Sequence, residues 1–283
     1  MHICKPDPFR DEREMITHDF IRDVRINQNR DGYRFSVDAL LLASFVKLPR
    51  VKKVADIGAG SGIIGLLLAR QYPKAEVALI ELQESLAKRA EENIALNGFG
   101  SRVRVIRADI KAINERIFEI HTLQSVMGRR HYMLNNPSDE YGTMVDSFDL
   151  VVSNPPFRRT KTGLLSLGDE RAVARHEIKL PLTELARAGS LLLRHHGRFC
   201  IIHLPERLAD IVRALNSHAM EPKRLRFVHS YHSSEAKMLL LEAVKGGRGG
   251  MKIERPLVIY NGDGSYTEEM KEYYSCEGIE PTR

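Results

Sequence analysis

A glycine-rich loop between a predicted strand and a predicted helix constrains this chain more than any other feature. The loop from Asp56 to Gly62 reads DIGAGSG, and it joins the β-branched run Lys53–Ile57 to the apolar segment Ile63–Gln71. Glycine is needed where the backbone turns with a positive φ or approaches a ligand closely, because no Cβ intervenes. A strand that passes through such a loop directly into a helix is typical of nucleotide-binding α/β folds.

Short apolar runs alternate with helical patterns along most of the chain. Between the second and third runs, Leu86, Ala90 and Ile94 repeat every four residues and predict a helix with one buried face. This alternation predicts an α/β fold, a doubly wound, mostly parallel, seven-stranded Rossmann-like sheet with a late antiparallel strand. The predicted strands are Lys53–Ile57, Glu76–Glu81, Val103–Arg107, Phe148–Ser153, Arg198–His203, Leu225–His229 and Lys237–Val244.

Additions are expected at both ends of this sheet domain. We predict an N-terminal extension over residues 1–50, the main domain over 51–245, and a glycine-rich loop with a tail over 246–283. A helix is expected near Ile113–Val126, and the polar stretch 128–147, which contains Pro137, is expected to be a surface insertion. In the tail we expect a short strand within Pro256–Tyr260 and a helix at Thr267–Tyr274.

Acidic residues stand at the ends of the first three predicted strands. Asp56 lies just before the glycines, Glu81 ends the second strand and Asp109 follows the third. Carboxyl ends of parallel strands meet at the sheet edge where ligands bind, so these three acids are expected to converge. A carboxylate at Asp56 suits a cation such as an α-amino group and would repel a pyrophosphate.

The fourth predicted strand ends in the turn Asn154-Pro155-Pro156-Phe157. Two prolines end the strand, fix two φ angles and leave carbonyls that only accept hydrogen bonds. The Asn154 side-chain oxygen and the Pro155 carbonyl can accept both hydrogens of a planar exocyclic amine, while Phe157 offers a ring for stacking a base. Such contacts favour the more pyramidal, nucleophilic amine, which suits methyl transfer to nitrogen.

Together these motifs resemble those of class I S-adenosylmethionine-dependent methyltransferases that act on amines. The segment from Asp31 to Ala43, which reads DGYRFSVDALLLA, is similar to the stretch before the glycine loop in the bacterial tRNA1(Val) adenine-37 N6-methyltransferase family. The ARHE sequence ending at Glu177, the PLVIY run from Pro256 and the GSYTEE run from Gly264 also resemble this family. Many of its members have tyrosine where Phe157 stands, and either ring can stack.

The resemblance implies a cofactor, a substrate and roles for particular residues. The cofactor is S-adenosylmethionine, the substrate is an adenine in RNA, with tRNA expected, and the N-terminal extension serves as a lid. Arg34 and Asp38 either close over the cofactor or form a structural ion pair. The residues implied at the adenine are Asn154, Pro155, Pro156 and Phe157, and those at the cofactor are Arg34, Asp38, Asp56, Gly58, Ala59, Gly60, Gly62, Glu81, Leu82, Asp109, Ile110 and Asn154.

Charge and cysteine content bear on partners and location. The formal net charge of +6 favours a polyanionic partner if the excess is clustered, and a basic run after the turn is the expected contact with RNA phosphates. The longest apolar run is far shorter than the roughly 20 residues that span a bilayer, and the three cysteines predict no disulfide framework. We therefore expect a cytoplasmic protein with no membrane or metal partner. The basic residues assigned to RNA are Arg158, Arg159, Lys161, Arg171 and Arg175.

Three other functions remain open from sequence. A protein glutamine N5-methyltransferase also uses an Asn-Pro-Pro turn, and the basic run argues against it. An NAD-dependent dehydrogenase fits the GxGxxG pattern of Gly60, Gly62 and Gly65, but Asp56 and the lack of an identifiable hydride-transfer pair oppose it. A non-catalytic RNA-binding module is opposed by the intact turn.

Overall fold

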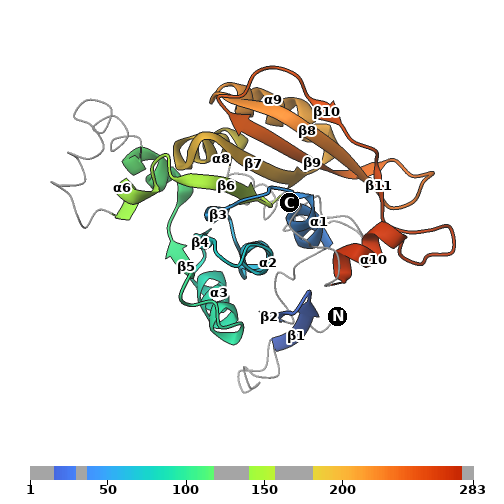
Figure 1. The fold of residues 1–283 in the computed structure, drawn as a ribbon, viewed down its shortest axis with the longest axis horizontal. Coiled ribbons are helices and arrows are strands. Elements are labelled where there is room, and N and C mark those ends of the chain that lie inside the picture. Colours follow the sequence, from blue (N-terminus) through green and yellow to red (C-terminus); the bar gives the residue numbers. More distant parts are fainter. Residues whose placement is uncertain (1–15, 30–36, 118–139, 157–180, 276–283) are drawn as a thin grey trace, which may run out of the picture.

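The fold is built on a nine-stranded mixed sheet, seen in a computed structural model that describes residues 16–29, 37–117, 140–156 and 181–275. The strand order is β10-β8-β9-β7-β6-β3-β4-β5, and β11 also pairs with β8 (Figure 1). The strands are β3 (Lys53–Ile57), β4 (Glu76–Glu81), β5 (Val103–Arg107), β6 (Phe148–Ser153), β7 (Leu193–His203), β8 (Met220–His229), β9 (Ala236–Lys245), β10 (Lys252–Ile253) and β11 (Leu257–Val258).

Strand direction follows the expectation for a doubly wound sheet. The four neighbouring pairs from β7 through β6, β3 and β4 to β5 are parallel, whereas β9 runs antiparallel to both β7 and β8. The seven longer strands are those predicted from sequence, including the late antiparallel one. Two short strands, β10 and β11, extend the sheet beyond β8.

Helices cover both faces of the sheet because side chains alternate between faces along each strand. Val54 and Val77 contribute to one hydrophobic cluster with α1 and α2, whereas Ala55 and Ala78 contribute to a second with α8 and α9. Residues 110–117 are also helical. The named helices are α1 (Val37–Phe45), α2 (Ile63–Gln71), α3 (Glu84–Leu96), α6 (Glu140–Met144), α8 (Leu182–Leu192), α9 (Leu208–Asn216) and α10 (Glu268–Tyr274), with a 3₁₀ turn η2 (Pro205–Arg207).

The additions at the two ends of the chain meet beside α1. Residues 16–29 form an unanticipated hairpin of β1 (Ile16–Ile21) and β2 (Val24–Asn29). Between its strands, the Arg22 guanidinium donates to the Ser44 hydroxyl of α1 and to the Tyr273 carbonyl of α10. This buried arginine ties the N-terminal hairpin to the C-terminal helix. The division into residues 1–50, 51–245 and 246–283 stays a prediction.

The end of the expected surface insertion is part of the core. Met144 and Val145 are each 1% exposed and pack in the cluster with α8 and α9. The prediction of a surface position is wrong at these residues. Most residues of the stretch are polar, and this composition did not indicate that its two apolar side chains pack into the core. Residues 118–139 lie outside the described ranges, including most of the helix expected at Ile113–Val126.

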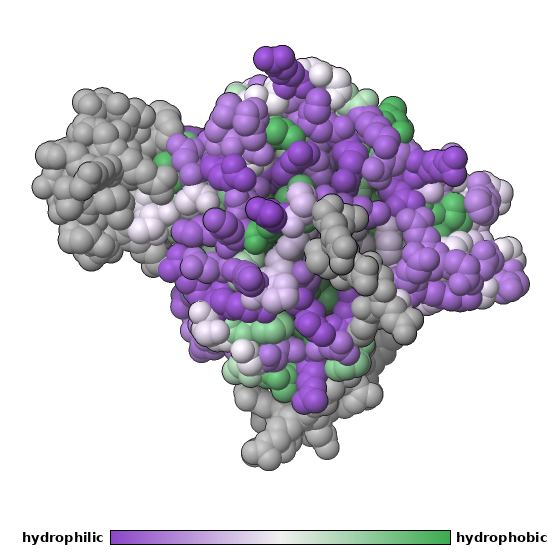
Figure 2. Space-filling view, in the orientation of Figure 1, coloured by the Kyte–Doolittle hydropathy of each residue, from purple (hydrophilic) through white to green (hydrophobic). Residues whose placement is uncertain are grey.

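Among the described helices, none has the length and apolar character needed to cross a membrane. The face shown in Figure 2 is largely hydrophilic, with apolar residues in scattered patches.

Candidate active site

The predicted site residues gather where the parallel strands end. β3 is hydrogen-bonded to β4 on one side and to β6 on the other, with Ile57 opposite both Ile80 and Ser153. The glycine loop after β3 therefore lies between the end of β4, where Glu81 stands, and the turn after β6, where Asn154 begins. Adjacent strands are about 4.8 Å apart, so three segments distant in sequence become immediate neighbours.

The glycine loop has the positive φ angles that its glycines predict. Gly58, Gly60 and Gly62 have φ values of 72°, 58° and 86°, a region that side-chain-bearing residues rarely adopt. The amides of Gly58 and Ala59 donate to the Ile80 carbonyl at 2.9 and 3.1 Å, which folds the loop over the end of β4. Gly62 then leads directly into α2.

Gly65 in the first turn of α2 allows this helix to approach the sheet. A Cβ at this position would lie 2.1 Å from Leu79 Cδ2 and 3.3 Å from Val77 Cγ1. Gly65→Ala should therefore lower the free energy of unfolding by about 1–3 kcal/mol through overpacking, despite the better helix propensity of alanine. Denaturant unfolding checks this, with Gly100→Ala as control because nothing lies within 4 Å of its added Cβ. Equal stability of the two variants would contradict the packing argument.

Asp56 is a fully buried acid at the base of the loop. Its Oδ2 accepts a hydrogen bond from the Gly65 amide at 2.9 Å, and its Oδ1 is buried with no hydrogen-bond partner. Burial raises the pKa of Asp56 to about 7; the Gly65 hydrogen bond opposes this rise and the nearby Glu81 carboxylate adds to it. An unsatisfied buried oxygen costs about 1–3 kcal/mol, which a cationic or hydrogen-bonding ligand would offset.

Glu81 holds the glycine loop in place. Its Oε2 accepts from the Gly60 amide at 2.8 Å and its Oε1 from the Gln83 amide at 2.8 Å. The carboxylate is 5% exposed, and Leu82 beside it is 41% exposed. An exposed leucine at this edge offers an apolar surface to the flat part of a ligand.

Asp109 and Ile110, after β5, have structural roles. Asp109 Oδ1 accepts from the Lys111 amide at 2.9 Å, so this half-buried acid caps the helix that covers residues 110–117. Ile110 is 5% exposed and packs in the second hydrophobic cluster. Their predicted contacts with a cofactor stay predictions.

The turn after β6 is fastened to the glycine loop. The buried Ser153 hydroxyl donates to the Ile57 carbonyl at 2.8 Å, joining the last residues of β6 and β3. Asn154 is half-buried, Pro155 is buried and Pro156 is exposed. This hydrogen bond and the two prolines restrain the turn, and Asn154 and Gly58 each follow directly on the paired residues Ser153 and Ile57.

Asn93 of α3 is a positioning residue that the sequence reasoning missed. Its side chain donates to the Ser61 carbonyl at 3.0 Å in the glycine loop, and its Oδ1 accepts from the Asn27 amide at 2.8 Å in β2. It is completely buried and thus links the N-terminal hairpin to the loop. An asparagine inside a helix beside apolar Ala90 and Ile94 is locally unfavourable, and this was the available signal.

The predicted site residues outside the sheet edge differ in whether the structure describes them. Asp38 is described, and it is buried in the first turn of α1. The remaining ones lie outside the described residues, namely Arg34, Phe157, Arg158, Arg159, Lys161, Arg171 and Arg175.

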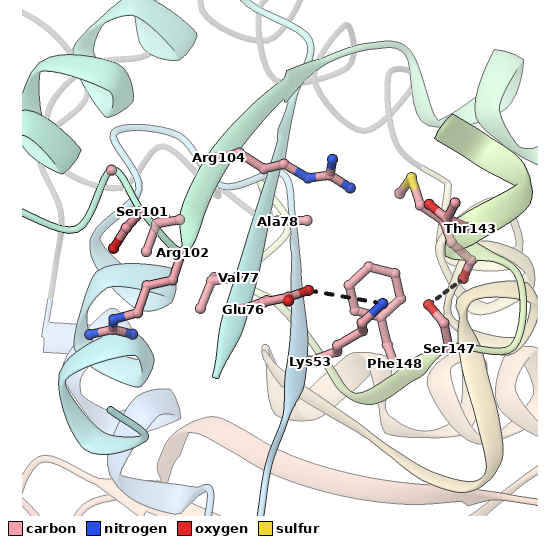
Figure 3. A pocket seen from close by; sticks show the side chains of 13 residues that line it. Lys53, Glu76, Val77, Ala78, Ser101, Arg102, Arg104, Thr143, Ser147 and Phe148 are labelled. Carbon is pink, nitrogen blue, oxygen red and sulfur yellow. Dashed lines mark hydrogen bonds and ion pairs between the residues drawn. The ribbon is translucent and has the colours of Figure 1, made fainter. Parts of the chain in front are cut away.

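A cavity of about 370 Å³ lies at the opposite edge of the sheet (Figure 3). It is lined by Lys53, Glu76, Val103 and Phe148, the first residues of β3, β4, β5 and β6. None of the predicted site residues lines it, and ligands of open α/β sheets bind at the carboxyl edge. We therefore place the site at the glycine loop. Within the described ranges, no group of three or more His, Cys, Asp or Glu side chains is arranged to hold a metal ion.

The chain is similar to known proteins in sequence and in fold. Residues 35–120 match the model of the methyltransferase small domain. In solved structures, the fold is similar to that of a predicted O-methyltransferase from Agrobacterium tumefaciens, with a TM-score of 0.61, 24% identity and coverage of 86% of this chain and 96% of that one.

Curated relatives cover most of the chain. A protein of Haemophilus influenzae (strain PittEE) named tRNA1(Val) (adenine(37)-N6)-methyltransferase is 26% identical, over 87% of this chain and 92% of its own length. A protein of the same name from Porphyromonas gingivalis (strain W83) is 30% identical, over 77% of this chain and 76% of its own length. The glycine loop, Glu81 and the Asn-Pro-Pro turn lie at one edge of the sheet. Given these motifs and this identity, the chain belongs to the tRNA1(Val) (adenine(37)-N6)-methyltransferase family.

Proposed function

We propose that this protein transfers a methyl group from S-adenosylmethionine to the N6 amine of an adenine in tRNA. The observation that carries the proposal is the Asn154 turn, held against the glycine loop by the Ser153 to Ile57 hydrogen bond. One edge of the sheet thereby offers a rigid amine-accepting turn beside a loop suited to a nucleoside-bearing cofactor. A tRNA substrate makes the cytoplasm the expected place of action.

The cofactor side of this site fits a cationic amino acid joined to a nucleoside. The unsatisfied Oδ1 of Asp56 is an acceptor for an α-amino group. Glu81 stands at the end of β4, where a ribose-binding acid is expected, and Leu82 is exposed beside it. The positive φ values of Gly58 and Gly60 let the backbone approach a ligand closely. We assign these residues and Ala59 and Gly62 to the cofactor.

The chemistry requires positioning rather than a strong base. The cofactor supplies a methyl group on a sulfonium, which is already an electrophile. Asn154 Oδ1 and the Pro155 carbonyl accept the two N–H groups of the adenine amine, so the nitrogen lone pair is directed away from the ring system. As the new N–C bond forms and the S–C bond breaks, these acceptors stabilise the positive charge that develops on nitrogen, and one proton is then released to solvent.

The basic residues after the turn are assigned to the RNA backbone. Replacing Arg158, Arg159 and Lys161 together with alanine should weaken RNA binding. It should also flatten the plot of log affinity against log salt by about 0.7–0.9 for each phosphate that the variant no longer binds. Filter binding at several salt concentrations measures the slope.

A matched control removes the same charge from the other edge of the sheet, by replacing Lys53, Lys74 and Arg104 with alanine. We expect the slope of this variant to equal that of the wild type. An unchanged slope in the first triple variant would assign those three residues to a solvated surface and would favour a protein glutamine substrate.

Methylation of isolated tRNA tests the function itself. Purified protein, labelled cofactor and tRNA from cells lacking the gene should yield N6-methyladenosine at one position, mapped by nuclease digestion and mass spectrometry. RNA from cells with the gene, already modified, should accept little label. Incorporation into protein glutamine but not into RNA would overturn the proposal.

A further inference from the structure

Four tyrosines form a continuous row of ring contacts near the C-terminus. Tyr231 contacts Tyr260, Tyr260 contacts Tyr266, and Tyr266 contacts Tyr274, with ring centroids 5.6, 5.3 and 5.3 Å apart. The planes of successive rings differ by 36°, 15° and 32°. We name these four residues the tyrosine ladder. They come from the β8–β9 turn, the segment after β11 and the end of α10, which lie side by side in Figure 1.

The ladder shares an edge of the sheet with the active site. β8 is antiparallel to β9, which is antiparallel to β7, so β8 runs in the same direction as β6 and β3. Tyr231 follows the end of β8, and Tyr260 follows β11, which is parallel to β8. The strand order places β8 three strands from β6. By register, Ser153 is level with Leu225 of β8, so Tyr231 lies about 14 Å across the sheet from Asn154 and about 16 Å further along the strand direction. A few nucleotides can cover this span.

The ladder exposes aromatic surface that the fold does not use. Tyr260 packs against the first hydrophobic cluster, whereas Tyr231, Tyr266 and Tyr274 are 42%, 37% and 36% exposed. The neighbouring Tyr273 is a structural contrast, because it is 8% exposed and its hydroxyl is hydrogen-bonded to Arg226 and Glu269. A row of exposed rings on an anchored base is the arrangement on which unpaired bases stack.

The charges beside the ladder point to bases rather than phosphates. Lys271 is paired with Glu268 at 2.6 Å, and Arg226 with Glu269 at 2.6 Å, so each of these two cations is neutralised by an adjacent acid. Base stacking needs only a ring face, whereas phosphate binding needs unpaired cations.

We propose that the tyrosine ladder stacks unpaired bases of the RNA whose adenine enters the site beside Asn154. This proposal rests on the proposed function and adds a second contact region for the same substrate. It explains why a C-terminal segment beyond the main domain is held to the sheet by β10 and β11.

Alanine at Tyr231 and Tyr266 removes two rings while keeping the backbone that presents them. The Tyr231 turn is held by the Ser234 hydroxyl, which bonds the Tyr231 amide and carbonyl, and the Tyr266 carbonyl accepts from Asn261. Each base that no longer stacks should raise the KM for tRNA between about fivefold and a hundredfold. We expect kcat and cofactor affinity to stay within about twofold. The salt slope of RNA binding should not change, because stacking releases no counterions.

Control variants separate stacking from loss of structure. Phenylalanine at both positions keeps the rings and should retain nearly wild-type KM. Ile253→Ala removes another exposed apolar side chain, 63% exposed on β10, and should have no effect. An unchanged KM in the double alanine variant, a phenylalanine variant as weak as the alanine one, or a changed salt slope would each overturn the proposal.

A binding measurement keeps this test independent of methyl transfer. The chain contains no tryptophan, so Tyr231→Trp introduces a single fluorescent reporter. A single-stranded oligoribonucleotide should quench it, whereas an abasic strand of the same length and charge should not. If no RNA is methylated but quenching depends on bases, the proposed function fails and the ladder stands. If RNA is methylated and both strands quench equally, the ladder proposal fails alone.

Discussion

We expect that replacing Asn154 with alanine lowers turnover about a hundredfold or more, while cofactor affinity stays near that of the wild type. In the proposed mechanism, the side-chain oxygen of Asn154 polarises the amine most strongly as charge develops on nitrogen, so its removal acts on the transition state more than on binding. In the proposed site, the glycine loop, Asp56 and Glu81 hold the cofactor, and the substitution leaves the hydrogen bonds of both acids intact.

Single-turnover methyl transfer to tRNA measures the rate, and calorimetric titration measures cofactor affinity. Asn154→Asp is the matched variant, because it has the same shape and keeps an acceptor oxygen, so it should retain more activity than the alanine variant. The Ser153 hydrogen bond is outside the substituted side chain, and thermal unfolding should confirm an intact fold. Near-normal transfer by the alanine variant would show that the amine is not held by this turn.

Cofactor binding should strengthen as the pH rises through about 7 and level off above it, until the α-amino group of the cofactor itself loses its proton. Burial raises the pKa of Asp56 to about 7, from an ordinary value of 3.8. Below about pH 7 the protein without cofactor therefore holds Asp56 mainly as the neutral acid. A cationic α-amino group binds the carboxylate, and the fraction of carboxylate falls about tenfold for each pH unit below 7. Binding below pH 7 should therefore release a proton, which calorimetry in buffers of different ionisation enthalpy detects.

The same pKa predicts an opposite trend for the stability of the unliganded protein. Between pH 3.8 and about 7 the folded state retains a proton on Asp56 that the unfolded chain has released. The contribution of this group to the free energy of unfolding therefore decreases as the pH rises through this window and is constant above it.

Asp56→Asn separates these two effects. It should flatten the pH dependence of binding, weaken cofactor binding at pH 8 by about 1.5–3 kcal/mol because a charged hydrogen bond is removed, and stabilise the unliganded fold at that pH. Cofactor affinity that is constant from pH 6 to pH 8 in the wild type, or unchanged at pH 8 in the variant, would contradict an ionised Asp56 as a cofactor ligand.

Local sequence was sufficient for the central strands. β3, β4, β5 and β6 begin and end at the predicted residues, because β-branched runs bounded by glycine, proline or charged residues are local signals. β7 begins at Leu193 rather than at the predicted Arg198, since its pairing with β6 shifts register between these two positions. The irregular stretch contains His195 and His196, and His196 has a positive φ of 61°, which a regular strand does not allow.

Long-range contacts decided the parts that local patterns missed. The hairpin of β1 and β2 is attached to α3 through Asn93 and to α10 through Arg22, and neither partner is near it in the chain. Met144 and Val145 appear as two apolar residues in a polar stretch, yet they close the core beside α8 and α9. Such contacts depend on which elements pack together, and no short window contains that information.

The sequence alone predicted the residue types of the proposed site and their positions at strand ends. Strand ends and tight turns impose local requirements on glycine, proline and side-chain acceptors. The sequence did not predict which of these strand ends become neighbours in the fold. Ser153 bonds Ile57 across 96 residues because β6 inserts beside β3, an order set by the packing of whole helices on the sheet. The same packing buries Asp56 and aligns four separate tyrosines, since burial and proximity are properties of the assembled fold.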